Sequence, residues 1–176
     1  GNNAGSYSIT QGSLDAGTNY TISFVPDNFV ITAKPVTVTA DANQNKIYGF
    51  ADPTFSYSIS SALKNGDSFT GLLSRTAGNN VGSYSITQGS LSAGTNYNLT
   101  FVSDNFVITA KPVTVTADAN QNKVYGSADP TFSYRITPAL EIGDTFTGAL
   151  SRTTGENTGS YVFTQGTLSA GTNYSI

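Results

Sequence analysis

The chain of 176 residues contains no cysteine, histidine, methionine or tryptophan, and only 11% of its residues are charged. Without cysteine there is no disulfide scaffold and no thiolate nucleophile, and without histidine the usual general base is missing. The side chains that bind zinc best are missing as well. These absences predict that the protein is not an enzyme and uses no cofactor.

Basic residues are few and scattered: eight Lys and Arg residues leave a formal net charge of -3. A phosphate backbone requires a basic stripe, so nucleic acid is excluded as a partner. No apolar run approaches the roughly 20 residues that span a bilayer, so we expect no membrane insertion. No signal peptide opens the chain, which is also what a mature or excised segment would show.

A repeat of 77 residues organises the chain. The stretch FVITAKPVTVTA occurs at residues 29–40 and again, unchanged, at residues 106–117. The copy at residues 23–99 and the copy at residues 100–176 are identical at 58 positions and differ at 19. Residues 1–22 are a further, partial copy at the start of the chain. The sequence therefore predicts a tandem array. The expected parts are the C-terminal part of a first repeat (1–33), a complete second repeat (34–110) and a third repeat lacking its last strand (111–176). Because both ends fall inside a repeat, we expect a window from a longer series.

Within one repeat, apolar and polar residues alternate with a period of two. Val36 and Val38 alternate with threonines, and Phe55, Tyr57 and Ile59 alternate with serines. This pattern predicts half-buried strands. Turn signals recur about every 8 to 12 residues, which is typical of a small antiparallel β domain. We expect at most one helical turn, at residues 60–66.

The differences between the copies predict which side chains face solvent and which lie in the core. Ser58 becomes Arg135 in the third repeat, so this position is expected on the wet face of its strand. Other differences exchange one apolar residue for another, and we expect these positions in the core: Ile47 and Val124, Leu72 and Ala149, Ile86 and Phe163.

Five motifs follow one another in the second repeat: VTADANQNKIYG, ADPTFSYSI, LKNGDSFTG, LSRTAGNNVGSYSITQGSL and NYNLTFVSDNFVITA. Their order resembles the MBG repeat of the YGX type, found in long bacterial surface proteins and adhesins, and the resemblance covers every repeat of the chain. It implies an extracellular location at the bacterial cell surface and a stalk or interaction role, and it brings no catalytic residues. The expected fold is mainly β, with each domain either β-grasp-like or an immunoglobulin-like sandwich, arranged end to end as an extended rod.

One polar motif offers candidates for a calcium site. Its oxygen-bearing side chains fall at positions 1, 3, 5 and 12, as in an EF-hand loop. Lys46 stands at the sixth position, where an EF-hand requires glycine, so a polar turn is the competing interpretation. Aromatic residues could also contact a glycan, although most lie on the alternating apolar positions. A glycan- or calcium-binding extracellular module is therefore the alternative function. The calcium candidates are Asp41, Asn43, Asn45, Asp52, Asp118, Asn120, Asn122 and Asp129.

The junction between repeats is the segment most informative about function. Proline fixes its own φ and biases the preceding residue toward extended geometry, so the Ala-Lys-Pro seam is expected to be stiff. Stiff seams favour a spacer whose length scales with the number of repeats. The expected partners are neighbouring repeats and, because the third repeat lacks its last strand, other copies joined head to tail by strand complementation. The junction residues are Ala33, Lys34, Pro35, Ala110, Lys111 and Pro112.

Overall fold

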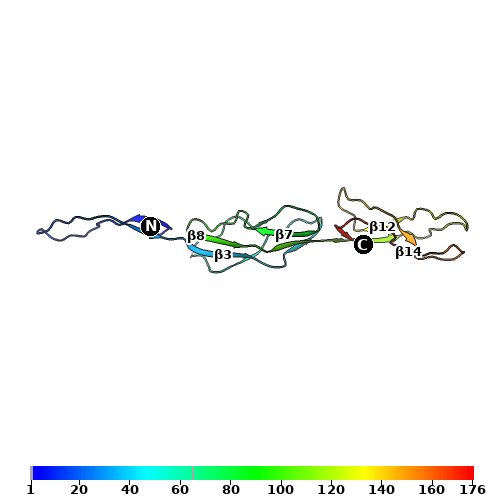
Figure 1. Ribbon diagram of the computed structural model, residues 1–176, viewed down its shortest axis with the longest axis horizontal. Coiled ribbons are helices and arrows are strands. Elements are labelled where there is room, and N and C mark those ends of the chain that lie inside the picture. Colours follow the sequence, from blue (N-terminus) through cyan, green and yellow to red (C-terminus); the bar gives the residue numbers. More distant parts are fainter. Residues whose placement is uncertain (1, 65) are drawn as a thin grey trace. The chain divides into compact units, whose positions relative to one another are not determined.

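The computed structural model describes residues 2–64 and 66–176 (Figure 1). Within these residues every regular element is a β-strand and no helix is present. The mainly β fold expected from the alternating pattern is therefore confirmed. Where the sequence predicts at most one helical turn, the chain runs through bends to a turn at Gly66; Asn65 lies outside the described residues.

The residues group into two compact units. Unit 1 comprises Gly1–Gln44, Thr54–Thr76 and Ser85–Asn105, and unit 2 comprises Asn45–Pro53, Ala77–Tyr84 and Phe106–Ile176. The division does not follow the sequence repeat, because three segments of the second repeat (45–53, 77–84 and 106–110) group with the third. Each unit therefore contains residues from two consecutive repeats.

Unit 1 contains a two-stranded hairpin and a three-stranded sheet. In the hairpin, β1 (Gly5–Ser8) pairs antiparallel with β2 (Asn28–Ile31). In the sheet, β3 (Lys34–Ala40) lies between two partners. One partner, β5 (Tyr57–Ile59), is antiparallel to β3, and the other, β8 (Tyr97–Val102), runs parallel to it (Figure 1).

The alternating residues of β3 build the core of unit 1. Val36 is 1% exposed and Val38 is 0% exposed, whereas Thr37 and Thr39 are half-buried. Val36 lies in one cluster with Ala93 and Tyr97. Full burial of a valine side chain stabilises the fold by roughly 1.5–3 kcal/mol, so this strand anchors the repeat.

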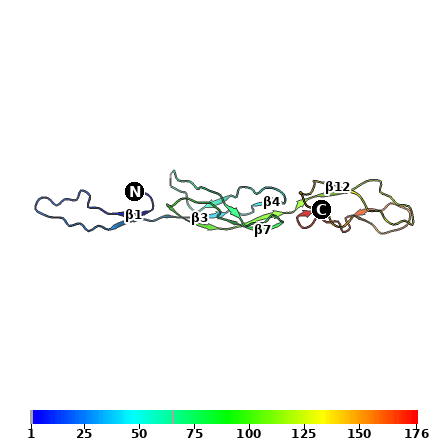
Figure 2. The ribbon, with the colours of Figure 1, turned by 90° about the horizontal axis from the view of Figure 1, so that it is seen from above.

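A four-stranded sheet has the order β4-β9-β7-β6 (β4 and β7 are labelled in Figure 2). β4 runs parallel to β9, and β6 is antiparallel to β7. Phe106 and Ile108 of β9 are both 0% exposed, so β9 fills the interior between β4 and β7. The bounds are β4 (Asn45–Ile47), β6 (Ser74–Arg75), β7 (Gly82–Thr87) and β9 (Asn105–Thr109).

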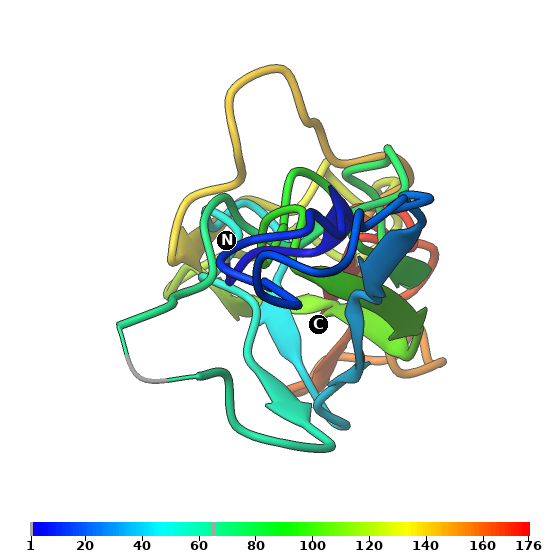
Figure 3. The ribbon, with the colours of Figure 1, turned by 90° about the vertical axis from the view of Figure 1, so that its left-hand side faces the viewer.

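The third repeat forms three short strand pairs within unit 2. β10 (Lys111–Pro112) runs parallel to β15 (Tyr174–Ser175), and the other two pairs are antiparallel. The loop that follows β12 is gold in Figure 3, and within it the Glu141 amide donates to the Tyr174 hydroxyl of β15 at 2.8 Å. The antiparallel pairs are β11 (Thr114–Ala117) with β12 (Tyr134–Thr137), and β13 (Ser151–Arg152) with β14 (Phe163–Thr164).

The pairing differs in one respect from the antiparallel domain that the turn signals suggest. Each of the first two strands of the second repeat runs parallel to one of its last two strands, β3 to β8 and β4 to β9. Turn signals mark where strands end, but they do not identify the partner of a strand that is distant in sequence. An immunoglobulin-like sandwich has antiparallel sheets, so the parallel pairs depart from that pattern, and the choice between the two alternatives stays a prediction.

The predicted wet face is confirmed, while the predicted core positions are only partly correct. Arg135 is exposed and Ile86 is 0% exposed, as expected. Leu72 is 61% exposed, Ile47 is 40% exposed and Val124 is 77% exposed, so these core assignments are wrong. The remaining two positions of the set also lie outside the core, with Ala149 exposed and Phe163 only half-buried. The reason is local, because Leu72 precedes β6 and Ile47 ends β4, where the sheet no longer covers a side chain.

Candidate functional site

The backbone of each junction continues from one repeat into the next with almost no linker. Only Thr32 and Ala33 separate β2 from β3, and only Ala110 separates β9 from β10. Lys34 and Pro35 already belong to β3, and Lys111 and Pro112 form β10. All six residues singled out at the two seams therefore lie within or directly beside paired strands.

The lysine of each seam is fixed at both its main chain and its side chain. The amide N of Lys34 donates to the Asn96 carbonyl at 2.8 Å, and its Nζ donates to the Ala62 carbonyl at 2.7 Å. Lys111 repeats this arrangement: its amide N donates to the Asn173 carbonyl at 2.9 Å. Its Nζ also forms an ion pair with Glu141. The seam is thus tied to the repeat that begins there.

A hydrogen-bonded asparagine pair joins the first repeat to the second inside unit 1. The Oδ1 of Asn96 accepts the Ala4 amide at 2.8 Å, and its Nδ2 donates to Asn3 Oδ1 at 3.1 Å. One side chain of the second repeat thereby satisfies a backbone donor and a side-chain acceptor of the first. We call this arrangement the asparagine clamp.

The same clamp recurs between the second and third repeats, inside unit 2. Asn173 Oδ1 accepts the Val81 amide at 2.9 Å, and Asn173 Nδ2 donates to Asn80 Oδ1 at 3.1 Å. Each atom pair is the 77-residue counterpart of the first clamp. Sequence reasoning missed these residues; the only available signal was asparagine at the same two positions of each copy.

A tyrosine also crosses from the second repeat to the third within unit 2. Tyr48 Oη donates to Asp144 Oδ2 at 2.9 Å, and Tyr174 Oη donates to the same oxygen at 2.5 Å. The two rings meet edge to face with centroids 5.4 Å apart. Burial, followed by the hydrogen bond to Asp144, raises the pKa of Tyr174 to about 12. The hydrogen bond to Asp144 also raises the pKa of Tyr48.

The glycine that follows Tyr48 allows this close approach. Gly49 has φ +86°, and a Cβ at this position would collide with the carboxylate of Glu141 in the third repeat. Both the conformation and the space therefore favour glycine. The Tyr-Gly pair of the sequence motif is thus a contact element at the junction, a role that sequence reasoning did not predict.

The calcium candidates lie at a structured turn. Asn43 and Asn120 have φ values of 63° and 62°, the left-handed conformation that asparagine tolerates. Gln44 fastens the turn to Ser56, which directly precedes β5: its Nε2 donates to the Ser56 carbonyl at 3.0 Å and its Oε1 accepts the Ser56 amide at 2.8 Å. This bonding accounts structurally for the polar motif.

Cations neutralise several carboxylates of the calcium candidates. Asp52 pairs with Lys46 at 2.7 Å, and Asp118 pairs with Arg135 at 3.0 Å. Asp129 pairs with Lys123 at 2.7 Å and with Arg152 at 2.8 Å. A metal would have to displace these partners. Among residues 2–64 and 66–176, no group of three or more Asp, Glu, His or Cys side chains is placed to hold a metal ion. The amide candidate Asn45 lies in β4, and Asn122 is the residue of the third repeat that aligns with it.

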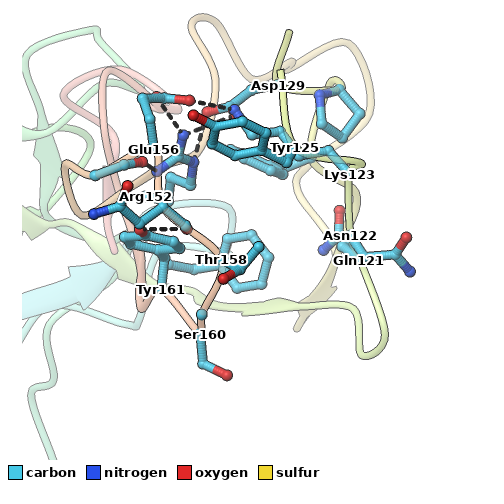
Figure 4. A pocket seen from close by; sticks show the side chains of 16 residues that line it. Gln121, Asn122, Lys123, Tyr125, Asp129, Arg152, Glu156, Thr158, Ser160 and Tyr161 are labelled. Atoms are coloured by element: carbon cyan, nitrogen blue, oxygen red, sulfur yellow. Dashed lines mark hydrogen bonds and ion pairs between the residues drawn. The ribbon is translucent and has the colours of Figure 1, made fainter. Parts of the chain in front are cut away.

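The third repeat contains a cavity of about 420 Å³, which we call the third-repeat cavity. Figure 4 shows Gln121 and Asn122 on one side and Ser160 and Tyr161 on the other. Phe132 and Phe163 line it and meet edge to face, with centroids 4.9 Å apart. Its lining thus combines aromatic rings with polar main chain and side chains.

Four charged side chains gather at one end of the third-repeat cavity (Figure 4). Arg152 pairs with Asp129 at 2.8 Å and with Glu156 at 2.9 Å, and Lys123 pairs with the same two carboxylates. Hydrogen bonds from Arg152 and then Lys123 lower the pKa of Asp129. Those from Lys123 and then Arg152 lower the pKa of Glu156. We call these four residues the charged network.

The comparisons with known proteins agree with the repeat structure. The family described as MBG domain (YGX type) matches residues 1–30, 36–107 and 113–176. No curated protein and no solved structure matches the chain. In the described part of the chain, no helix has the length and apolar character that crossing a bilayer requires. Domains of this family are structural repeats found in extracellular surface proteins. The chain belongs to the MBG domain (YGX type) family, whose matches cover it as three repeats.

Proposed function

We propose that this chain is a non-catalytic spacer or stalk segment of a bacterial cell-surface adhesin or extracellular fibre. The observation that carries the proposal is the asparagine clamp, which recurs with the same atoms at both junctions. A junction that only linked two domains would need no matching contacts. Repeated contacts hold each repeat against the next, and a spacer requires this property.

The strand pairing of the second repeat supports a load-bearing role. The chain enters this repeat at the start of β3 and leaves it after β8 and β9. Because β3 and β8 run parallel, from Lys34 opposite Tyr97 to Thr39 opposite Val102, their entry and exit points lie at opposite ends of the ladder. A pulling force then loads the ladder hydrogen bonds together, in shear. Self-association by strand complementation is a further part of the proposal.

A distance measurement between spin labels tests the stiff junction. The natural chain has no cysteine, so Ser58→Cys and Arg135→Cys place unique labels on equivalent exposed strand positions of the second and third repeats. We expect a single narrow distance distribution from pulsed electron paramagnetic resonance. Asn80→Ala combined with Tyr48→Phe should broaden it, because both side chains lose their partners in the third repeat.

A matched control uses Asn157, the third-repeat counterpart of Asn80, which belongs to neither asparagine clamp described above. Asn157→Ala should leave the label distribution unchanged. A broad distribution in the unsubstituted chain would contradict the spacer proposal, since freely jointed repeats cannot set a distance.

A further inference from the structure

Two tyrosines of different repeats meet inside unit 2. Tyr48 directly follows β4 of the second repeat, and Tyr174 begins β15 of the third. Their rings stand edge to face, with centroids 5.4 Å apart. Both hydroxyls donate to one oxygen, Asp144 Oδ2, so they lie within two hydrogen-bond lengths of each other. We call these two residues the tyrosine pair.

The main chain holds both members of the tyrosine pair in place. The Tyr48 amide donates to the Thr109 carbonyl at 2.9 Å, and Tyr174 lies opposite Lys111 in the β10–β15 ladder. The Tyr174 hydroxyl also accepts the Glu141 amide at 2.8 Å. The two rings are therefore held close together by the fold rather than by a chance encounter of mobile side chains.

The placement of Tyr174 is also that of its counterpart in the second repeat. Tyr97 donates to Asp67 at 2.6 Å and accepts from the Lys64 amide at 2.8 Å. Tyr174 has a carboxylate and a main-chain amide as its partners in the same way. This environment thus belongs to the repeat itself, and Tyr48 of the preceding repeat adds the second ring.

Two phenol rings in this arrangement suit oxidative coupling. A tyrosine that loses one electron also releases its phenolic proton, and a carboxylate oxygen within hydrogen-bond distance can accept that proton. The resulting radical carries unpaired spin on the ring carbons ortho to the hydroxyl, so two neighbouring radicals join through these carbons. Because both hydroxyls lie on one oxygen of Asp144, the ortho carbons of the two rings begin close to each other.

We infer that the tyrosine pair is a cross-linking site, at which hydrogen peroxide acting through a haem peroxidase couples Tyr48 to Tyr174 as dityrosine. Each tyrosine gives up one electron and its phenolic proton, and the radicals form one carbon–carbon bond between ortho positions. The hydrogens on the two bonded carbons then move to the oxygens as protons, which restores both hydroxyls. The peroxide takes up two electrons and two protons and becomes two water molecules. The product joins the second repeat covalently to the third.

This inference goes beyond the spacer proposal, which requires only the non-covalent contacts at the junction. Other tyrosines that contact a ring lack a suitable partner. Tyr57 meets Phe69, and Tyr134 meets Phe146, each with centroids 5.7 Å apart. Phenylalanine has no hydroxyl and does not form such a radical, so these two ring pairs are internal negative controls.

Treatment of the full chain with hydrogen peroxide and a haem peroxidase tests the site. At low protein concentration we expect dityrosine fluorescence from a chain that remains monomeric on a denaturing gel. Trypsin should then release residues 47–64 joined to residues 153–176, lighter by two hydrogens than the separate peptides, and fragmentation should place the bond on Tyr48 and Tyr174. Tyr20 and Tyr125 are 76% and 70% exposed, so cross-links between chains at higher concentration report that the oxidant is active.

Three variants separate the tyrosine pair from other sources of dityrosine. Tyr48→Phe keeps the ring but removes its hydroxyl, so the joined peptides should disappear. Tyr57→Phe, within the same tryptic peptide, is the matched control and should form them as the unsubstituted chain does. Asp144→Asn replaces the proton acceptor by an amide. It should slow the coupling at least about tenfold, because a positioned base typically contributes 10²–10⁴-fold.

Three results would overturn the inference. The first is dityrosine between chains with no joined peptides from residues 47–64 and 153–176. The second is an undiminished yield of these joined peptides in Tyr48→Phe, and the third is an undiminished rate in Asp144→Asn. None of these results bears on the label distances measured without oxidant, so failure of this inference is distinguishable from failure of the spacer proposal.

Discussion

Single polar side chains determine how consecutive repeats meet. Tyr174 shares the carboxylate of Asp144 with Tyr48 of the preceding repeat, and Asn173 satisfies both Val81 and Asn80. In the second repeat, Tyr97 donates to Asp67 at 2.6 Å and accepts from the Lys64 amide. A tyrosine held by an aspartate is therefore built into each of these two repeats, and in the third repeat Asp144 also accepts the hydrogen bond from Tyr48 of the second.

Alkaline pH should destabilise the chain through Tyr174. Its folded-state pKa, raised to about 12, lies above the ordinary value of 10.0. The stabilising contribution is therefore complete below pH 10.0 and is lost as pH rises through about 12. Urea unfolding across this range should show that loss. Tyr174→Phe should lower the free energy of unfolding at neutral pH and flatten the alkaline decline.

The exposed Tyr20 supplies the control for this titration. Tyr20→Phe changes a side chain that is 76% exposed, so it should leave both stability and the alkaline decline as they are. An identical alkaline decline in the Tyr174→Phe variant would contradict the assignment to this residue.

At the scale of elements, the charged network connects two distant segments. Arg152 of β13 pairs with Asp129, which aligns with Asp52 in the loop after β4. Glu156 is special to the third repeat, because the second repeat has Asn79 at this position. Arg152 also lies over the ring of Tyr161, with its guanidinium carbon 4.8 Å from the ring centroid. These four charged residues line the third-repeat cavity.

Acid should remove the contribution of the charged network. The folded-state pKa values of Glu156 and Asp129 lie below their ordinary values of 4.5 and 3.8. Their contribution is present above those values and is lost as pH falls through the lowered folded-state pKa values. Glu156→Asn should therefore reduce stability slightly at neutral pH, and the difference from the unsubstituted chain should vanish in acid. Urea unfolding at both pH values measures it.

The reverse exchange in the second repeat provides the matched comparison. Asn79→Glu places a carboxylate at the position that corresponds to Glu156, within the sequence context of Lys46, Asp52 and Arg75. It should add a stabilising increment that also disappears in acid. A Glu156→Asn deficit that persists unchanged at low pH would contradict an electrostatic origin.

At the scale of the whole molecule, strand direction should set the response to force. In the second repeat β3 and β8 run parallel, so a pull on the chain loads their ladder in shear. In the hairpin of the first repeat, Gly5 lies opposite Ile31, so the same pull separates β1 and β2 one pair at a time. One chain therefore contains both geometries.

Single-molecule pulling from the chain ends should reveal the contrast. The β1–β2 hairpin should open at low force, and the second repeat should give a separate event at higher force. Its contour-length gain should be roughly 250 Å, from about 3.3–3.6 Å per extended residue. If the second repeat extends at a force as low as the hairpin does, the shear geometry does not carry load.

Sequence reasoning recovered the features that depend on neighbouring residues. Alternation placed Val36 and Val38 in the core and Arg135 at the surface. It failed at Leu72 and Ile47, because burial near a strand end depends on which distant strand covers it. The asparagine clamp joins residues 92 and 93 positions apart, a separation at which no local pattern indicates contact.

The sequence by itself determined the period of 77 residues, the mainly β character and the family, since each follows from residue order alone. Tertiary structure decided which of these strands form. Residues 82–87 and 159–164 share four of their six residues, yet the first stretch is a continuous strand and the second is a strand only at Phe163–Thr164. A strand exists through hydrogen bonds to a partner, and β7 lies between β9 and β6, whereas β14 pairs with β13 alone in a two-stranded sheet.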